Sequence, residues 1–393
     1  MISSRTTVVT ALGTTQTLAW ASSYYLPAIL GVPIARTLGV APSVFFGIFS
    51  GALLLSSGLA PTIGRIIDRH GGRAMLAASS GVLAAGLVLL SLAGNIAGLC
   101  AAWAVLGVGT AMGLYVPAFA ALARLYGHGA RGPITGVTLF AGFASTIGWP
   151  LSAFMLQHYG WRWTCLAWAA VNLFVCLPVN WLLIPAAASE PPEPRATETG
   201  DTSAAPDTQP GAMLILAFCF AATRFVSGAL AAHLPRLLEG AGASAVAAIA
   251  AGALVGPAQV GARLFEFSVM RKLHPLIPAR IALLLHPLGA ATMALFGPAA
   301  INVFAVLHGA GNGMLTIASG TLPLAIFGPA GYGRRNGFLA VPTRVAESAA
   351  PFVFGLLIDR FGTAALAVSA GLCLAAFTSL FALRARSAVV AHI

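Results

Sequence analysis

Residues 64–73 read Gly-Arg-Ile-Ile-Asp-Arg-His-Gly-Gly-Arg, a charged stretch between two long apolar runs. Charged residues make up only 8% of the chain, so four of them within ten positions mark a segment that lies in water. Two apolar helices cannot turn inside lipid, because the backbone groups of the turn would have no hydrogen-bond partners there. The arginines predict a cytoplasmic turn, since cytoplasmic loops of membrane proteins carry an excess of Lys and Arg.

The composition of the whole chain also indicates a membrane protein. Of its 393 residues 58% are hydrophobic, and the mean hydropathy is +0.89, both far above the values of a soluble domain. A net charge of +11 would suggest nucleic-acid binding in a soluble protein. Here the bases lie mostly at the ends of apolar runs, so we expect a lipid bilayer and no nucleic acid as partner. The five cysteines form no C-x-x-C pair, and neither a disulfide framework nor a metal site is expected.

Twelve apolar segments are long enough to span a bilayer, which takes about 20 residues each. We predict spans at 8–31, 44–65, 74–93, 97–123, 133–157, 162–184, 212–236, 243–267, 279–297, 300–327, 337–358 and 363–384. The segment 185–210 between the sixth and seventh spans is rich in Pro, Ser and Thr and holds five of the ten acidic residues. Such a composition predicts a flexible linker. The expected domains are therefore a six-helix bundle at 1–184, a cytoplasmic linker at 185–210 and a six-helix bundle at 211–393.

Basic residues are distributed unequally between the two sides of the predicted bundle. If both termini are cytoplasmic, fourteen bases lie in the tails, the linker and the cytoplasmic loops, and four lie on the opposite side. This asymmetry predicts that both termini and the linker are cytoplasmic. The cytoplasmic fourteen are Arg5, Arg65, Arg69, Arg73, Arg124, Arg131, Arg195, Arg271, Lys272, Arg280, Arg334, Arg335, Arg384 and Arg386, and the other four are Arg36, Arg162, Arg236 and Arg360.

The two halves of the chain show an internal repeat. Gly109-x-x-x-Gly113 in the fourth span recurs 200 residues later as Gly309-x-x-x-Gly313, and small residues at this spacing let membrane helices approach closely. Tyr126-Gly127, Gly136 and Pro150 recur at an offset of 201 as Phe327-Gly328, Gly337 and Pro351. Arg65-x-x-Asp68 recurs at an offset of 198 as Arg263-x-x-Glu266. Three features in the same order at nearly one offset indicate two similar six-helix halves.

The pattern G-x-x-x-D-R-x-G-x-R of residues 64–73 resembles the loop between the second and third helices of the major facilitator superfamily. The matching residues are Gly64, Asp68, Arg69, Gly71 and Arg73. Gly72 departs from the pattern, because many members carry a basic residue there. Two six-helix repeats joined by a linker are the architecture of this family. The resemblance covers essentially the whole chain.

The resemblance implies an all-α membrane protein of the inner membrane that works by alternating access, as a monomer and without a cofactor. In the family, spans 1, 4, 7 and 10 line a central cavity, with contributions from spans 5, 8 and 11. The acid of the loop motif, here Asp68, caps a neighbouring helix and pairs with basic residues, which gives the loop a gating role. By the repeat, we expect Arg263 and Glu266 to mirror Arg65 and Asp68 as a structural charge pair that latches the closed state.

Three ionisable residues lie near the middle of predicted spans, where charge is costly and therefore indicates function. They are Arg224 in span 7 and Arg344 and Glu347 in span 11. Two guanidinium groups near the midplane suit a carboxylate, since an arginine binds a carboxylate through two parallel hydrogen bonds. The alternative is a structural Arg344–Glu347 pair three residues apart on one helix face. Burial favours a protonated Glu347 and a nearby arginine favours the ionised form, so its role as a proton carrier stays open.

Further candidates come from spans 1, 4, 5 and 10. Tyr24 in span 1 and Asn312 in span 10 are expected to bind substrate, and His308 is a second proton-coupling candidate or a packed residue. Aromatic residues with polar tips suit a cavity as well as the membrane interface; these are Trp20, Tyr25, Tyr115 and Trp149, with Gln16 on the same face of span 1 as Tyr24.

No catalytic motif and no phosphate-binding loop occurs, so neither an enzyme nor an ATP-driven pump is expected. We expect a transporter for a small organic solute, an anion such as a monocarboxylate, with protons as a candidate coupling ion. The alternative is an exporter of a toxic or drug-like compound with Glu347 as proton carrier. Two departures weaken proton-driven drug export: span 4 holds no arginine between Trp103 and Ala123, and residues 142–150 only distantly resemble the G-P-x-x-G-G motif of drug antiporters. The sequence does not choose between import and export.

Overall fold

The computed structural model describes residues 4–186, 211–270, 273–328 and 332–383. Within these ranges, the side chains of Asp68, His128 and residues 332–334 lie outside the described part. The predicted linker at 185–210 lies almost entirely outside it as well.

Every regular element in the described ranges is helical. The α-helices are α1 (Arg5–Ser22), α2 (Pro27–Thr37), α3 (Pro42–His70), α4 (Arg73–Leu92), α5 (Ile96–Gly113), α6 (Tyr115–Tyr126), α7 (Arg131–Ala141), α8 (Ala144–Val171), α9 (Leu177–Leu183), α10 (Ala212–Gly240), α11 (Ala245–Ala253), α12 (Val255–Phe265), α13 (Leu276–Phe296), α14 (Ile301–Phe327), α15 (Tyr332–Phe361) and α16 (Ala365–Ser379). The predicted all-α membrane fold is confirmed.

Nine helical stretches in the described residues are long and apolar enough to cross a membrane. Three of them, at 131–183, 276–327 and 335–382, contain 53, 52 and 48 residues. At about 1.5 Å per residue each is more than twice the ~30 Å of a bilayer core. Each also contains a glycine of positive φ that breaks the helix direction: Gly160 (78°), Gly297 (57°) and Gly362 (57°). If each of these three stretches crosses twice, the count is consistent with the twelve predicted spans.

The first span is interrupted where its aromatic residues lie. α1 ends at Ser22 and α2 begins at Pro27, whereas the sequence predicted one helix over 8–31. The break follows from Pro27, which has no N–H to continue the α1 hydrogen-bond ladder. A wider turn, in which the Tyr25 N–H donates to the Trp20 carbonyl at 3.1 Å, replaces the regular pattern. The interruption leaves Tyr24 and Tyr25 outside regular helix and beside the other half of the protein.

The internal repeat is visible in the turns of the two halves. Glycines of positive φ recur at Gly39 and Gly242, Gly127 and Gly328, and Gly160 and Gly362. The offsets of 203, 201 and 202 define a structural register that differs slightly from the one taken from sequence.

Glycines bring the fourth and tenth spans close to their neighbours, as predicted. A methyl group on Gly109 would lie 2.8 Å from the side chain of Leu83 on α4. One on Gly309 would lie 2.6 Å from the Val255 carbonyl oxygen on α12. Close packing is therefore confirmed, but the two glycines face non-equivalent neighbours, because α4 belongs to span 3 and α12 to span 8. The structural equivalent of Gly309 is Gly107, where an added methyl group would lie 2.8 Å from the Ala52 carbonyl oxygen on α3.

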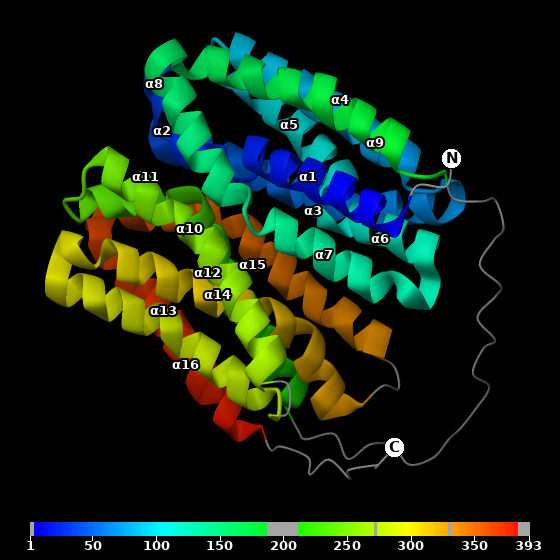
Figure 1. Cartoon of the computed structure of the whole chain (residues 1–393). Coiled ribbons are helices and arrows are strands. Elements are labelled where there is room, and N and C mark those ends of the chain that lie inside the picture. The colour runs from blue at the N-terminus through cyan, green and yellow to red at the C-terminus, as the bar shows by residue number, and fades with distance from the viewer. Residues whose placement is uncertain (1–3, 187–210, 271–272, 329–331, 384–393) are drawn as a thin grey trace.

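The N-terminal half (α1–α9) and the C-terminal half (α10–α16) lie side by side and are closer together at one end than at the other (Figure 1). The antiparallel order of the spans puts the start of α1, the end of α9, the start of α10 and the end of α16 at one end of the bundle, here called the terminal end. The halves converge at the opposite end, the far end, where α2, α8 and α11 lie, and diverge toward the terminal end (Figure 1). One seam joins α3 to α15, where the Phe352 N–H donates to Ser50 Oγ at 3.1 Å. The other joins α8 to α11, where Thr146 Oγ1 donates to the Ala253 carbonyl at 2.8 Å.

The outer surface of the bundle is apolar. Leu182, Leu214 and Leu295 expose about three quarters of their surface, at 74%, 75% and 76%. An apolar exterior of this extent is unfavourable in water and fits the hydrocarbon core of a bilayer. The polar side chains that the chain does bury are therefore concentrated between the helices.

Candidate functional site

A cavity of about 350 Å³ lies between the two halves. It adjoins a second cavity of about 170 Å³ in the C-terminal half, and Arg224, Ala340 and Thr343 line both. We call the two together the central cavity. It extends toward the terminal end, where it reaches Phe119 on α6 and Asn336 on α15. Helices α1, α3, α5 and α6 supply one wall, and α10, α14 and α15 supply the other.

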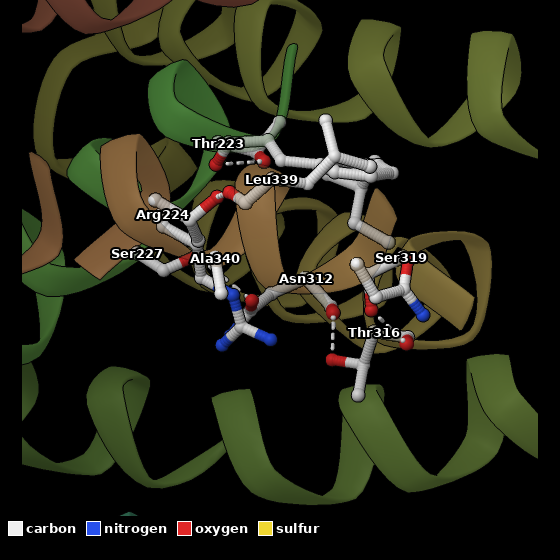
Figure 2. Close-up of a pocket in the computed structure, with 12 residues that line it drawn as sticks. Thr223, Arg224, Ser227, Asn312, Thr316, Ser319, Leu339 and Ala340 are labelled. Atoms are coloured by element: carbon white, nitrogen blue, oxygen red, sulfur yellow. Dashed lines mark hydrogen bonds between the residues drawn. The ribbon is translucent and has the colours of Figure 1, made fainter. Parts of the chain in front are cut away.

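The C-terminal wall carries the two predicted arginines. Arg224 on α10 and Arg344 on α15 both line the cavity, and neither makes a hydrogen bond or ion pair with any residue that the structure describes. Figure 2 shows the Arg224 guanidinium beside Asn312, and both residues line the cavity together with Thr316. Asn312 is held by Ser227, whose hydroxyl donates to its Oδ1 at 2.8 Å. Arg224, Arg344 and Asn312 thus meet at one cavity, although 120 residues separate the first from the second.

Glu347 also lines the cavity, but it does not pair with Arg344 as the alternative prediction supposed. Its Oε1 instead accepts a long hydrogen bond from the Tyr24 hydroxyl at 3.4 Å. The only ion pair within 4.0 Å among the described residues is Arg236–Asp359, far from the cavity. The Tyr24–Glu347 contact joins the two halves at the closed side of the cavity, so substrate-binding and coupling candidates from opposite halves touch each other.

The N-terminal wall is aromatic. The Trp20 ring lies 4.8 Å from Tyr115 and 5.0 Å from Tyr24, measured between ring centroids. Tyr115 stacks on Phe119 at 5.1 Å. We call Trp20, Tyr24, Tyr115 and Phe119 the aromatic wall. Sequence reasoning missed Phe119, although its position one helical turn after Tyr115 was a usable signal. Trp149, a weaker candidate, lies outside the cavity lining and donates from Nε1 to the Tyr25 carbonyl at 3.1 Å.

His308 lies outside the central cavity, in a buried histidine pair. Its Nδ1 lies 3.2 Å from Nδ1 of His286, whose Nε2 lies 2.9 Å from Ser369 Oγ. The Ser369 hydroxyl donates to the Leu366 carbonyl, so its oxygen is free to accept from His286 Nε2–H. His286 Nδ1 is then the acceptor of the pair and His308 Nδ1–H the donor. Sequence reasoning missed His286, because it lies on a different span from His308 and no local spacing connects them.

The predicted latch pair in span 8 is not formed. Arg263 makes no ion pair with Glu266; it donates from Nη1 to the Thr138 carbonyl of the other half at 3.1 Å and from Nη2 to Gln259 Oε1 at 3.3 Å. Glu266 is buried, and its Oε2 has no hydrogen-bond partner.

The cause of this error is the register of the repeat. The structural offset at the start of spans 2 and 8 is 203, from Gly39 and Gly242. This makes Arg263 equivalent to Ala60, which lines the central cavity, rather than to Arg65 in the loop. Arg263 accordingly lies more than a helical turn deeper in the bundle, within electrostatic range of Tyr25 and Tyr115. Its gating role remains a prediction, now for a contact between the halves.

The loop motif packs tightly between α3, α4 and α6. Gly71 adopts a φ of 86° and its N–H caps α3 by donating to the Ile67 carbonyl at 2.8 Å. Arg124 of α6 donates to the Arg69 carbonyl at 3.5 Å. A methyl group on Gly72 would collide with Ala121, which explains the glycine where the family pattern has a larger residue.

The other motif residues are placed as follows. Arg73 lies over the Trp181 ring with its Cζ 4.8 Å from the centroid, and a methyl group on Gly64 would meet open space. The side chain of Asp68 lies outside the described part, so the gating role predicted for it is untested.

Comparisons with known proteins agree with this geometry. A family model described as the Major Facilitator Superfamily matches residues 12–304. A crystal structure of a mutant of the nucleoside transporter NupG superimposes with a TM-score of 0.75 at 12% identity, covering 96% of this chain and 99% of that one. A bacterial homologue of the human lysosomal transporter Spinster, in an inward-facing and occupied conformation, gives 0.64 at 16% identity, covering 96% and 94%. The unoccupied inward-facing form gives 0.66 at 17% identity with the same coverage. No curated protein sequence matches the chain.

An all-helical membrane fold with two related halves and a polar cavity between them is typical of a membrane transporter. The chain belongs to the Major Facilitator Superfamily and is a multi-pass membrane protein. The family predicted from residues 64–73 and from the internal repeat is confirmed.

Proposed function

We propose that this protein is a secondary transporter that moves a small organic anion, a monocarboxylate, across the inner membrane by alternating access. The observation that carries the proposal is the pair of arginines, Arg224 and Arg344, which face the central cavity without a partner among the described residues. Charges held inside a membrane bundle are costly and are normally paired. Two unpaired guanidinium groups beside a cavity are therefore a site for an anionic solute.

The proposed orientation puts both termini in the cytoplasm. It rests on the excess of basic residues at the terminal end, where Arg5, Arg73, Arg124 and Arg131 lie. In this orientation the cavity faces the cytoplasm and the seams at the far end close it from the outside. The two Spinster-homologue structures that resemble this chain are described as inward-facing, which agrees with that orientation. We propose that the functional unit is a monomer, because both walls of the cavity come from one chain.

Coupling to protons is proposed at Glu347. Its contact with Tyr24 joins the two halves, so protonation of the carboxyl changes a contact that differs between the two states of an alternating-access cycle. His308 is the second candidate, and it would act through its pairing with His286.

A test of this proposal uses purified protein in vesicles and two labelled monocarboxylates, lactate and mandelate. We expect wild-type protein to accumulate at least one of them under a pH gradient. Glu347→Gln should abolish gradient-driven uptake and spare exchange of labelled for unlabelled acid, because exchange needs no net proton movement. Glu239→Gln, which changes an exposed acid near the far end, is the matched control. If gradient-driven uptake survives in Glu347→Gln, the coupling site is elsewhere and His308→Gln is tested in the same way.

The second candidate function is export of a neutral or cationic toxic compound. The observation that favours it is the position of Glu347 beside the aromatic wall, because aromatic faces and a carboxylate attract organic cations. In that case Glu347→Gln would lose drug resistance while Arg224→Gln and Arg344→Gln would leave acid binding unchanged.

A further inference from the structure

We infer that the anion is an aryl monocarboxylate, whose carboxylate lies between Arg224 and Arg344 and whose ring lies against the aromatic wall. The inference rests on the proposed function and names the class of acid that this cavity prefers.

The two walls of the cavity are chemically different. The aromatic wall comes entirely from α1, α6 and the turn after α1, all in the N-terminal half. Both unpaired arginines come from α10 and α15, in the C-terminal half. A solute that touches both walls must therefore be amphipathic, with an anionic group on one side and a planar apolar group on the other.

The charged residues that line the cavity carry a net positive charge that one further negative charge would neutralise. Among the described residues of its lining, Arg224 and Arg344 are cationic and Glu347 is anionic. When Glu347 is ionised, a monocarboxylate neutralises the remaining positive charge, whereas a neutral solute leaves it uncompensated in a medium of low dielectric. A dianion would add excess negative charge beside Glu347.

Aromatic rings in the wall are arranged to receive another ring. The Trp20 and Tyr115 rings are tilted by 48° at 4.8 Å, and Tyr115 and Phe119 are nearly parallel, at 16° and 5.1 Å. Aromatic pairs at such spacings gain energy beyond that of the area they bury. A planar ring is therefore favoured over a saturated ring of similar size. The cavity volume of about 350 Å³ suits a small-molecule ligand.

The second cavity, of about 170 Å³, supplies polar groups that can bind a hydroxyl group of the solute. It is lined by Thr223, Ser227, Asn312 and Thr316, close to Arg224. Asn312 accepts from Ser227 through Oδ1 and from Thr316 through its backbone carbonyl, and its Nδ2 makes no hydrogen bond to any residue that the structure describes. The amide can therefore donate to a carboxylate or to a hydroxyl beside it, as in a 2-hydroxy acid.

Four matched probes test the inference by equilibrium binding to the purified full-length protein. They are mandelate, hexahydromandelate with a saturated ring, lactate with a methyl group, and 1-phenyl-1,2-ethanediol without the carboxylate. We expect mandelate to bind about 2- to 10-fold more tightly than hexahydromandelate, the contribution of one aromatic contact. Lactate should bind more weakly than both, and the diol most weakly.

Two variants test whether the aromatic wall causes the preference for mandelate over hexahydromandelate. Tyr115→Leu should reduce the mandelate-to-hexahydromandelate ratio to about one, because it removes the ring that lies against both Trp20 and Phe119. Trp163→Leu, which removes a ring that is 66% exposed on the outer surface, should leave the ratio unchanged.

The outcomes separate this inference from the proposed function. Equal binding of mandelate and hexahydromandelate, with both lost in Arg344→Gln, overturns the aryl preference and leaves the anion transporter standing. Stronger binding of the diol than of mandelate, or no binding of any of the three acids at millimolar concentration, overturns both.

Discussion

Replacing Arg224 or Arg344 by glutamine should weaken mandelate binding by about 10- to 100-fold. Hydrogen bonds to charged groups contribute roughly 1.5–3 kcal/mol each, and every 1.4 kcal/mol corresponds to about a factor of ten in affinity. Neither guanidinium has a partner among the described residues, so removing one breaks no internal ion pair. The loss of affinity can then be assigned to the ligand rather than to a damaged fold.

Binding of mandelate is measured by calorimetry on each variant, together with its thermal unfolding. Arg360→Gln, which removes an exposed arginine at the far end, is the control and should bind as wild type. Arg344→Lys keeps the charge but loses the paired donors, so its affinity should fall between those of wild type and Arg344→Gln. Wild-type affinity in both glutamine variants would contradict an arginine-based anion site.

Replacing Gly252 by alanine should shift the protein toward the state that is open at the far end. Gly252 on α11 lies against Trp149 of the other half, and an added methyl group would lie 2.7 Å from its ring carbons. Trp149 cannot easily move, because it is buried and its Nε1 donates to the Tyr25 carbonyl. Overpacking of this kind costs about 1–3 kcal/mol. Because the cost falls only on the state in which this seam is closed, the ratio of the two states should change by about 5- to 100-fold.

The shift is measured as a distance between spin labels, one in the turn between α2 and α3 and one in the turn between α10 and α11. Cys100, an exposed native cysteine, is first replaced by serine. Gly261→Ala, where the added methyl group meets open space, is the matched control and should keep the wild-type distance distribution. A Gly252→Ala distribution identical to wild type would show that the seam does not separate in the cycle.

Much of the fold could be predicted from sequence because its causes are local. Apolar runs of about 20 residues report the spans, and Gly127 and Gly328 mark equivalent turns in the two halves. The sequence also places Arg224, Arg344 and Glu347 within spans, because a charged residue inside an apolar run can be recognised without a structure. All three line the central cavity.

Pairings between spans could not be predicted in this way. The Tyr24–Glu347 contact joins residues 323 positions apart, and the His286–His308 pair depends on how two helices rotate against each other. The repeat is present in the structure, but the sequence comparison aligned Arg263 at an offset of 198 instead of 203. Arg263 was therefore predicted at the level of the loop, whereas it lies at the level of the cavity. An error of five residues is more than a helical turn, which was enough to assign Arg263 a false partner in Glu266.

The central claim is that one anionic solute crosses the membrane at Arg224 and Arg344 by alternating access. Its most direct test is counterflow in vesicles that contain the purified protein and are loaded with unlabelled mandelate, with labelled mandelate outside and protein-free vesicles as the leak control. We expect a transient internal accumulation of label with wild-type protein and only the leak rate with Arg344→Gln. Label entering no faster than the leak with wild-type protein, or equally fast with Arg344→Gln, would contradict it.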